Sequence, residues 1–355
     1  MMIKKLIPLL MVLFFVSCQT DVDEKKDKQS KRKASTPIKI VSPGYDTEYI
    51  VGDEVKIELK AEESLSANEV TLFVDDTVYM SNIPFKSQTI TIDTKNGKVG
   101  WVDMYLEYKD AKGNPHRDNR RLIFFSDVTP QQKVAKIISE FPHNNTSYTQ
   151  GLEFYNGKLY ESTGQKGRSI IAEVDLTTGE ILRQKDLDAQ YFGEGITILN
   201  DTIYQITWQA GKCLMYDLDF NPIGEFDYEG EGWGLCNNGT SIIMTNGSSE
   251  IVWRNPKTFQ IEKRVYAFEP ETDVPALNEI ELIDGYLYAN IYTTNDIVKI
   301  DTATGKVISH IDCFDVAQKG RNFGDVLNGI AYNSQTQKIY ITGKLWSKLF
   351  EVKFE

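Results

Sequence analysis

Alternating apolar and polar residues recur along most of this chain, and they predict short β-strands rather than helices. The clearest example is the segment 192–208, in which apolar residues alternate on both sides of an Asn200-Asp201 turn. Alternation around such a turn is typical of a β-hairpin. A hairpin brings its two ends together, so Glu194 at the start of the first strand and Trp208 at the end of the second should lie on the same edge of a sheet.

The same layout recurs five times after residue 134, at intervals of about 40–50 residues, which is the period of β-propeller blades. Each repeat has an apolar first strand, a Gly, Asn or Asp turn, and a second strand rich in Tyr, Ile and Leu. We therefore predict a five-bladed β-propeller over residues 132–355. The last repeat supplies only three strands, and the apolar segment 134–141 has no partner. We expect that segment to be the missing outer strand.

A separate set of candidate strands precedes the repeats. These strands cover residues 38–41, 55–59, 70–74, 89–92, 102–106 and 122–125. Strands at this spacing, separated by Gly, Asn and Asp turns, favour an immunoglobulin-like β-sandwich over residues 37–128. No catalytic residue types gather there, so we interpret it as a spacer or docking module.

The N-terminus has the pattern of an export signal. Lys4 and Lys5 precede an apolar stretch at residues 6–16, which ends near Cys18 in a sequence that resembles the lipobox of bacterial lipoproteins. We predict a lipoprotein signal peptide at residues 1–18, lipidation of Cys18, and a disordered charged tether at residues 19–36. The protein would then be exported and anchored to the bacterial cell envelope, at the outer membrane. An ordinary cleaved signal peptide is the alternative.

Composition agrees with an all-β protein, because aromatic residues and glycine are plentiful and long apolar helical repeats are absent. The formal net charge of −12 argues against nucleic acid as the partner. Cys213, Cys236 and Cys313 are far apart in sequence and lack metal-binding spacing, so we expect them to be small buried residues. We expect a monomer.

In a propeller, the starts of the first strands and the ends of the second strands meet on one face around the axis. This geometry predicts a rim built from one acid, one amine, several amides and aromatic rings, a mixture that suits a small polar ligand or a peptide end. The rim residues are Gln150, Glu194, Trp233, Asn278 and Asn328 at strand starts, and Ser162, Thr163, Trp208, Asn246, Tyr292 and Lys344 at strand ends. The two histidines of this part, His143 and His310, are unpaired, so a histidine-ligated zinc site is not expected.

Ten short motifs between residues 141 and 354 together resemble the plant and bacterial type of glutaminyl-peptide cyclotransferase. They are Phe141-Pro-His143, Tyr148-Thr-Gln-Gly-Leu152, Glu161-Ser-Thr-Gly164, Phe192-Gly-Glu-Gly195, Thr207-Trp208, Gly232-Trp-Gly-Leu235, Leu277-Asn-Glu279, Ala289-Asn290, Asp325-Val-Leu-Asn-Gly-Ile-Ala331 and Thr342-Gly-Lys-Leu-Trp346. The resemblance implies a five-bladed propeller that converts an N-terminal glutamine to pyroglutamate and releases ammonia.

The resemblance also implies roles for the rim residues. Glu194 would be the acid/base residue, with Gln150, Trp208, Trp233, Asn278 and Lys344 around the substrate. Rim geometry adds Tyr292 and Asn328 to the substrate-binding set. The family usually has tryptophan where this chain has Tyr292, so pocket size or substrate preference can differ. The substrate would be a peptide or protein with an N-terminal glutamine, and no metal or cofactor is implied.

The chemistry fits these residue types independently of the resemblance. The α-amine of the substrate attacks its own γ-carboxamide, so positioning supplies much of the acceleration. A carboxylate such as Glu194 can move the proton from the amine to the departing ammonia, while Lys344 or Asn278 stabilises the developing oxyanion.

Two other classes of function stay open at this point. Glu194, Asn278 and Asn328 are oxygen ligands that suit a calcium-dependent propeller hydrolase such as a lactonase. Alternatively, the rim binds peptide ends or glycans without catalysis.

Overall fold

The computed structural model describes residues 36–355, which form 28 strands and one short helix. The protein is all-β, as the alternating pattern predicted. Within these residues no helix has the length and apolar character needed to span a membrane. The predicted signal peptide, Cys18 and all of the predicted tether except Thr36 lie outside the described residues.

The first eight strands form two sheets, one with the order β1-β3-β6 and the other with the order β2-β8-β7-β4-β5. Their bounds are β1 Ile38–Ser42, β2 Thr47–Ile50, β3 Glu54–Ala61, β4 Ala67–Val74, β5 Thr77–Met80, β6 Gln88–Asp93, β7 Gly100–Asp110 and β8 Pro115–Phe125. All six predicted strands are present, whereas β2 and β5 were missed. All four residues of β5 are exposed, so this strand has no apolar face to reveal it.

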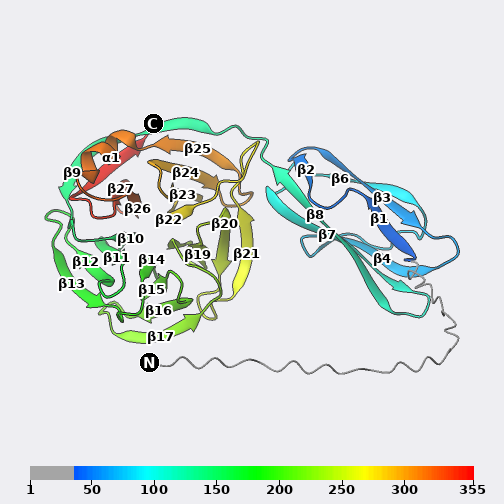
Figure 1. The fold of residues 1–355 in the computed structure, drawn as a ribbon, viewed down its shortest axis with the longest axis horizontal. Coiled ribbons are helices and arrows are strands. Elements are labelled where there is room, and N and C mark those ends of the chain that lie inside the picture. The colour runs from blue at the N-terminus through cyan, green and yellow to red at the C-terminus, as the bar shows by residue number, and fades with distance from the viewer. Residues whose placement is uncertain (1–35) are drawn as a thin grey trace, which may run out of the picture. The chain divides into compact units, whose positions relative to one another are not determined.

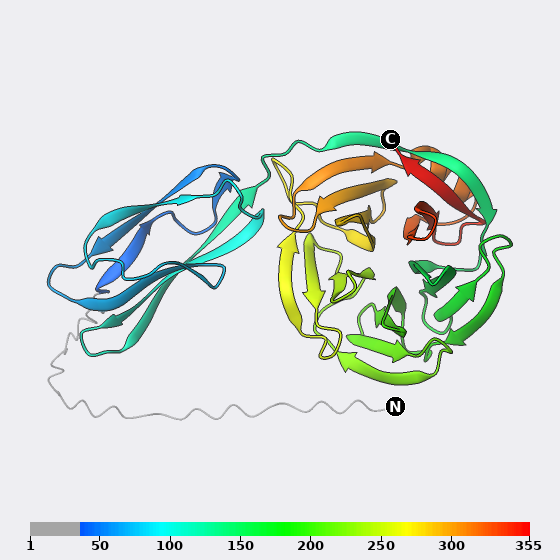
Figure 2. The ribbon, with the colours of Figure 1, turned by 180° about the vertical axis from the view of Figure 1, so that it is seen from behind.

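The remaining strands form three four-stranded sheets, β10-β11-β12-β13, β14-β15-β16-β17 and β18-β19-β20-β21, and one eight-stranded sheet. Figure 1 shows these sheets around a common centre, with β10, β14, β22 and β26 innermost and β13, β17, β21 and β25 at the periphery. Figure 2 shows the same arrangement from behind. The bounds are β10 Thr149–Tyr155, β11 Lys158–Thr163, β12 Ile170–Val174, β13 Ile181–Asp186, β14 Gly193–Leu199, β15 Thr202–Thr207, β16 Lys212–Tyr216, β17 Pro222–Asp227, β18 Leu235–Asn237, β19 Ile242–Thr245, β20 Glu250–Arg254, β21 Ile261–Tyr266, β22 Leu277–Ile283, β23 Tyr286–Ile291, β24 Asp296–Asp301, β25 Val307–Asp312, β26 Leu327–Asn333, β27 Lys338–Gly343 and β28 Lys348–Phe354.

Strand β9 (Gln131–Pro142) joins the two halves of the eight-stranded sheet, whose order is β22-β23-β24-β25-β9-β28-β27-β26. Its first residues pair in parallel with β25, and the rest of the strand pairs antiparallel with β28. The pairing with β28 confirms that the segment 134–141 is the outer strand of the last repeat. Because β28 is the last strand, its pairing with β9 ties the beginning of this part of the chain to its end.

The inner strands pack against one another in the sequence β10, β14, β18, β22 and β26, and β26 in turn contacts β10. Close packing depends on small residues at the strand starts. A Cβ added to Gly195 would lie 2.4 Å from the backbone nitrogen of Leu235 on the next inner strand. A side chain at this position would therefore push β14 and β18 apart. The apolar core lies between adjacent sheets; for example, Leu152 and Ala172 pack with Ala331 and Leu349.

Helix α1 (Phe314–Arg321) was not predicted from the sequence. It follows β25 and buries Val316, Ala317 and Gly320, and Gly320 packs against the ring of Trp346. Eight residues are too few for a helical period to stand out, and the helix is stabilised by this packing rather than by propensity. The three cysteines are buried, as predicted, and Trp253 and Trp346 are buried as well.

Candidate active site

Seven of the eight predicted site residues line one pocket of about 210 Å³ at the starts of the inner strands. This volume is below the usual range for drug-sized ligands and suits a single side chain at a peptide end. Tyr148 and Phe192 also line the pocket and were not among the predicted site residues. The complete lining is Tyr148, Gln150, Phe192, Glu194, Trp208, Trp233, Asn278, Tyr292 and Lys344.

Glu194 lies on β14, lines the pocket and is only 5 % exposed. Within residues 36–355, its carboxylate accepts one hydrogen bond, from Gln150 Nε2 to Oε1 at 3.1 Å. Ser162 Oγ donates to the main-chain oxygen of Glu194, which holds the backbone in place. Burial raises the pKa of Glu194 well above its usual range, against the opposing charge of Lys344. The Glu194 carboxyl therefore keeps its proton to a higher pH than an ordinary glutamate does, which suits a group that must accept a proton and return it.

Asn328 does not line the pocket, although its strand start suggested that it would. It is fully buried, and its Nδ2 donates to Gln150 Oε1 at 3.2 Å and to the backbone oxygen of Thr149 at 3.0 Å. Gln150 in turn donates to Glu194. Asn328 thus fixes the orientation of the Gln150 amide, so that its NH₂ group points at the Glu194 carboxylate.

Five aromatic rings form the wall of the pocket. The Tyr148 and Phe192 centroids are 6.2 Å apart, those of Phe192 and Trp208 are 5.7 Å apart, and those of Trp233 and Tyr292 are 5.4 Å apart. All three pairs meet edge to face, a geometry that aromatic pairs favour. The wall has two gaps, one between Trp208 and Trp233 and one between Tyr292 and Tyr148.

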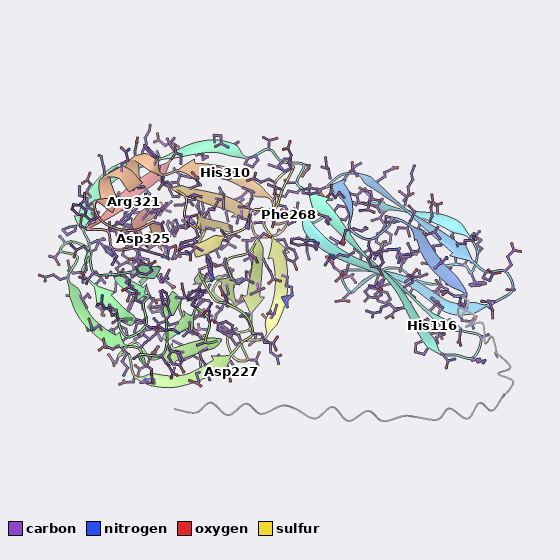
Figure 3. All side chains as sticks on the ribbon, viewed as in Figure 1. His116, Asp227, Phe268, His310, Arg321 and Asp325 are labelled. Carbon is purple, nitrogen blue, oxygen red and sulfur yellow. The ribbon has the colours of Figure 1, made fainter. Side chains whose placement is uncertain are left out.

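Lys344 closes the second gap. Its Nζ lies 5.0 Å from the ring centroids of both Tyr148 and Tyr292, and the residue is 3 % exposed. Burial lowers the pKa of Lys344, while the charges of Glu194 and Asp325 raise it. Asp325 follows helix α1 beside Arg321, as Figure 3 shows, and it accepts a hydrogen bond from the Tyr148 hydroxyl at 3.2 Å. Lys344 makes no ion pair within 4.0 Å among the described residues, so its ammonium is free to meet a substrate.

Asn278 supplies a further polar group to the lining of the pocket. It is 2 % exposed, and its Oδ1 has no hydrogen-bond partner within residues 36–355. A buried amide oxygen without a partner is costly, which makes it a natural acceptor for an N–H of a bound molecule.

The other predicted rim residues do not line the pocket. Ser162 and Thr163 are buried behind it, and Asn246 shapes a turn by accepting a hydrogen bond from Ser248. His143 is buried and contacts Glu161, and His310 contacts Glu269. No group of three or more His, Cys, Asp or Glu side chains in the described part of the chain could hold a metal ion.

A family model described as glutamine cyclotransferase matches residues 121–354, which is more than half of the chain. The chain belongs to the glutamine cyclotransferase family. The match covers every strand from β9 to β28 and all residues that line the pocket. Nearly all of the first eight strands lie outside it.

Two relatives of known identity agree with membership in this family. A curated glutaminyl-peptide cyclotransferase from Arabidopsis thaliana is 32 % identical over 236 residues, which is 64 % of this chain and 74 % of the relative. The crystal structure of Myxococcus xanthus glutaminyl cyclase superposes with a TM-score of 0.60 at 33 % identity, covering 64 % of this chain and 99 % of that chain. The glutamine cyclotransferase fold therefore accounts for the C-terminal two thirds of the chain.

Proposed function

We propose that this protein is a glutaminyl-peptide cyclotransferase, which converts the N-terminal glutamine of peptides or proteins to pyroglutamate and releases ammonia. The observation that carries the proposal is the position of Glu194: a buried carboxyl with one hydrogen-bond partner, facing a pocket of single-residue size. Family membership and the names of both relatives support it.

In the proposed reaction, the α-amino nitrogen of the substrate attacks its own γ-carboxamide carbon and closes a five-membered ring. Glu194 accepts a proton from the attacking nitrogen, and the tetrahedral intermediate carries its negative charge on the former carboxamide oxygen. Glu194 then delivers the proton to the departing nitrogen, the C–N bond of the carboxamide breaks, and ammonia leaves. Such acid/base help contributes roughly 10²–10⁴-fold to the rate.

Lys344 and Asn278 would each contact one of the two reacting groups of the substrate, the carboxamide and the α-amine. The Lys344 ammonium suits the developing oxyanion, because it is buried and its charge is not neutralised by a close ion pair. The free Oδ1 of Asn278 suits an N–H of the attacking amine. Gln150 keeps the Glu194 carboxylate oriented, and Asn328 keeps Gln150 oriented.

The aromatic wall would hold the aliphatic part of the glutamine side chain folded toward its own amine. Ring closure is intramolecular, so restricting the side chain to this folded conformer removes much of the entropic barrier. The small volume of the pocket serves that restriction.

The finer architecture is also part of the proposal. The three four-stranded sheets, β22–β25, and β26–β28 with β9 would be the five blades of a propeller. The closed circuit of contacts among β10, β14, β18, β22 and β26 supports this count. The two sheets of β1–β8 would be an immunoglobulin-like sandwich that serves as a spacer or docking module.

Export and lipid anchoring through Cys18 remain proposals about residues that the structure does not describe. Metabolic labelling with a fatty acid tests them directly. The wild-type chain should become labelled and fractionate with membranes, whereas Cys18→Ala should lose both properties. Labelling that survives in Cys18→Ala would contradict the anchor.

The decisive experiment measures ammonia release from a dipeptide with N-terminal glutamine, with and without EDTA. Release that survives EDTA, with mass spectrometry showing the pyroglutamyl product, is the expected result. Activity that is lost on chelation and restored by calcium would favour a calcium-dependent hydrolase. Tight binding of the dipeptide without ammonia release would favour a binding function.

A further inference from the structure

Glu231 lies behind the first gap in the aromatic wall, and the mechanism above does not use it. Its Oε2 accepts hydrogen bonds from both indole N–H groups, from Trp208 at 2.7 Å and from Trp233 at 3.0 Å. Its Oε1 accepts a hydrogen bond from Gln209 Nε2 at 3.0 Å. One carboxylate oxygen therefore joins two rings, one directly after β15 and one shortly before β18, that form no aromatic pair with each other.

The five aromatic rings of the wall, together with Lys344 and Glu231, therefore form a continuous ring of contacts around the pocket. Tyr148, Phe192 and Trp208 form one arc, and Trp233 and Tyr292 form the other. Lys344 bridges one gap through its contacts with both tyrosine rings, and Glu231 bridges the other through both indoles. Hydrogen bonds to an ionised acceptor are about twice as strong as those between neutral groups, so the Glu231 carboxylate holds the two indoles strongly.

The backbone around Glu231 is held on both sides. The amide of Gly232 donates to the backbone oxygen of Trp208 at 3.0 Å, and the amide of Trp233 donates to that of Thr245 at 3.0 Å. A Cβ added to Gly232 would lie 2.3 Å from the Tyr228 hydroxyl oxygen, so the Tyr228 side chain packs closely against this segment. The backbone hydrogen bonds and the three side-chain hydrogen bonds together hold the Glu231 carboxylate beside the two indoles.

We propose that Glu231 is a positioning residue for cyclisation, which clamps Trp208 and Trp233 against the substrate and whose negative charge acts on Glu194. This inference rests on the proposed function, because both effects are read out in the same reaction. It assigns to Glu231 no contact with the substrate, since Glu231 is absent from the pocket lining.

The charge of Glu231 shifts the pKa of Glu194 in a definite direction. The titratable groups that face Glu194 are Lys344, Glu231, Tyr148 and Tyr228, with Tyr292 on the pocket wall. Burial raises the pKa of Glu194 most, Lys344 lowers it, and Glu231 raises it further. Glu194 must be deprotonated to accept the proton of the amine, so activity falls as the pH drops through its pKa. Removing the charge of Glu231 should move this acid limb to lower pH.

Two variants separate the clamp from the charge. Glu231→Gln removes the charge and replaces one acceptor oxygen by a donor, whereas Glu231→Asp keeps the charge but is too short to reach both indoles. Glu229→Gln is the matched control, because Glu229 is exposed, lies two residues away, and makes no side-chain hydrogen bond within residues 36–355.

We expect Glu231→Gln to raise KM for a glutaminyl dipeptide about tenfold, the cost of one hydrogen bond to a charged group, and to shift the acid limb of kcat/KM to lower pH. Glu231→Asp should raise KM without moving the limb, and Glu229→Gln should match the wild type in both. Near-UV circular dichroism of the indoles should change in both Glu231 variants.

A folded Glu231→Gln variant with wild-type KM and an unmoved limb would overturn the inference. If Glu231→Gln does not fold, an unchanged KM in Glu231→Asp would overturn the clamp. If wild type and Glu229→Gln both release no ammonia, the proposed function fails instead; calorimetric binding of the dipeptide and the indole circular dichroism then decide whether the clamp exists.

Discussion

Two buried glutamates in this protein have nearly the same exposure and opposite electrostatics. Glu194 on β14 is 5 % exposed and Glu161 on β11 is 1 % exposed. Glu161 accepts hydrogen bonds from His143 Nε2 at 3.1 Å, Ser147 Oγ at 3.1 Å and Thr149 Oγ1 at 2.7 Å. Glu194 accepts only the bond from Gln150.

The difference in partners reverses the direction of the pKa shift. Burial raises the pKa of both carboxyls. For Glu161, the charge and the hydrogen bond of His143 outweigh burial, with help from Thr149, so its pKa is lowered overall. For Glu194 burial dominates and its pKa is raised. Burial alone therefore does not make a carboxyl reactive. What matters is how few hydrogen-bond donors and positive charges the protein places around the buried carboxylate.

The sharpest test of this contrast is Glu194→Gln, and it should have the largest effect. We expect kcat/KM to fall by about 10²–10⁴-fold, because the amide cannot take the proton of the amine. The raised pKa of Glu194 means that its ionised form costs stability above the ordinary pKa, so the variant should be at least as stable as the wild type at neutral pH. Ammonia release and thermal unfolding measure the two quantities. Near-normal turnover in a folded variant would remove Glu194 from the mechanism.

The matched change at the other glutamate, Glu161→Gln, should act on stability instead. Leaving His143 buried without its carboxylate should lower the free energy of unfolding by about 3 kcal/mol. Urea denaturation at pH 5.5 is the appropriate measurement. A variant as stable as the wild type would mean that Glu161 and His143 do not form a stabilising pair.

The pH window of this effect follows from the two shifts. The lowered pKa of Glu161 gives stability that is present above the ordinary glutamate value of about 4.3 and is lost as the pH falls through the folded value. The pKa of His143 is raised by Glu161 despite burial, so its contribution is present below about 6.5 and is lost as the pH rises through the folded value. The difference between wild type and Glu161→Gln should be greatest between these two values.

Lys344→Met should have the next largest effect on activity. Removing a buried ammonium that faces the oxyanion should reduce kcat by about 10²-fold, the usual cost of one such group. Lys344 lowers the pKa of Glu194, so the variant should shift the acid limb of kcat/KM to higher pH, opposite to the shift expected for Glu231→Gln. A pH–rate profile for the two variants side by side tests both signs. A shift in the same direction would show that these charges do not act on Glu194.

Much of this pocket could be predicted from the sequence, because repeats place equivalent strand starts at one rim. The same reasoning also predicts that Tyr148 and Phe192 lie at the rim. Each lies two residues before a predicted site residue, Gln150 or Glu194, and directly before the inner strand begins, β10 or β14. The position of these two residues in the repeats therefore indicates that they belong to the rim.

Asn328 and Glu231 could not have been placed this way. Gly329 has φ of 119°, whereas Gly151, Gly195 and Gly234 do not take a positive φ, and Asn328 contacts Gln150 instead of lining the pocket. A glycine follows the rim residue in four of the repeats, so the sequence does not show which one takes a left-handed conformation. Glu231 acts through contacts made by a loop whose path depends on packing against Tyr228.

Changes at Tyr292 should have the smallest effect and report on the shape of the site rather than its chemistry. The tyrosine hydroxyl makes no side-chain hydrogen bond within residues 36–355, and the ring contacts Trp233 and Lys344. Tyr292→Phe should therefore change kcat/KM by less than about threefold, since a free hydroxyl contributes little.

Tyr292→Trp keeps the aromatic wall but adds bulk to a pocket of about 210 Å³. It should raise KM more for peptides with a large second residue than for those with glycine there, while kcat stays the same, because the ring touches the substrate and not the transferred proton. Measuring KM across a series of glutaminyl dipeptides tests this. If KM rises equally for every second residue, Tyr292 contacts the glutamine itself and the second residue lies elsewhere on the rim.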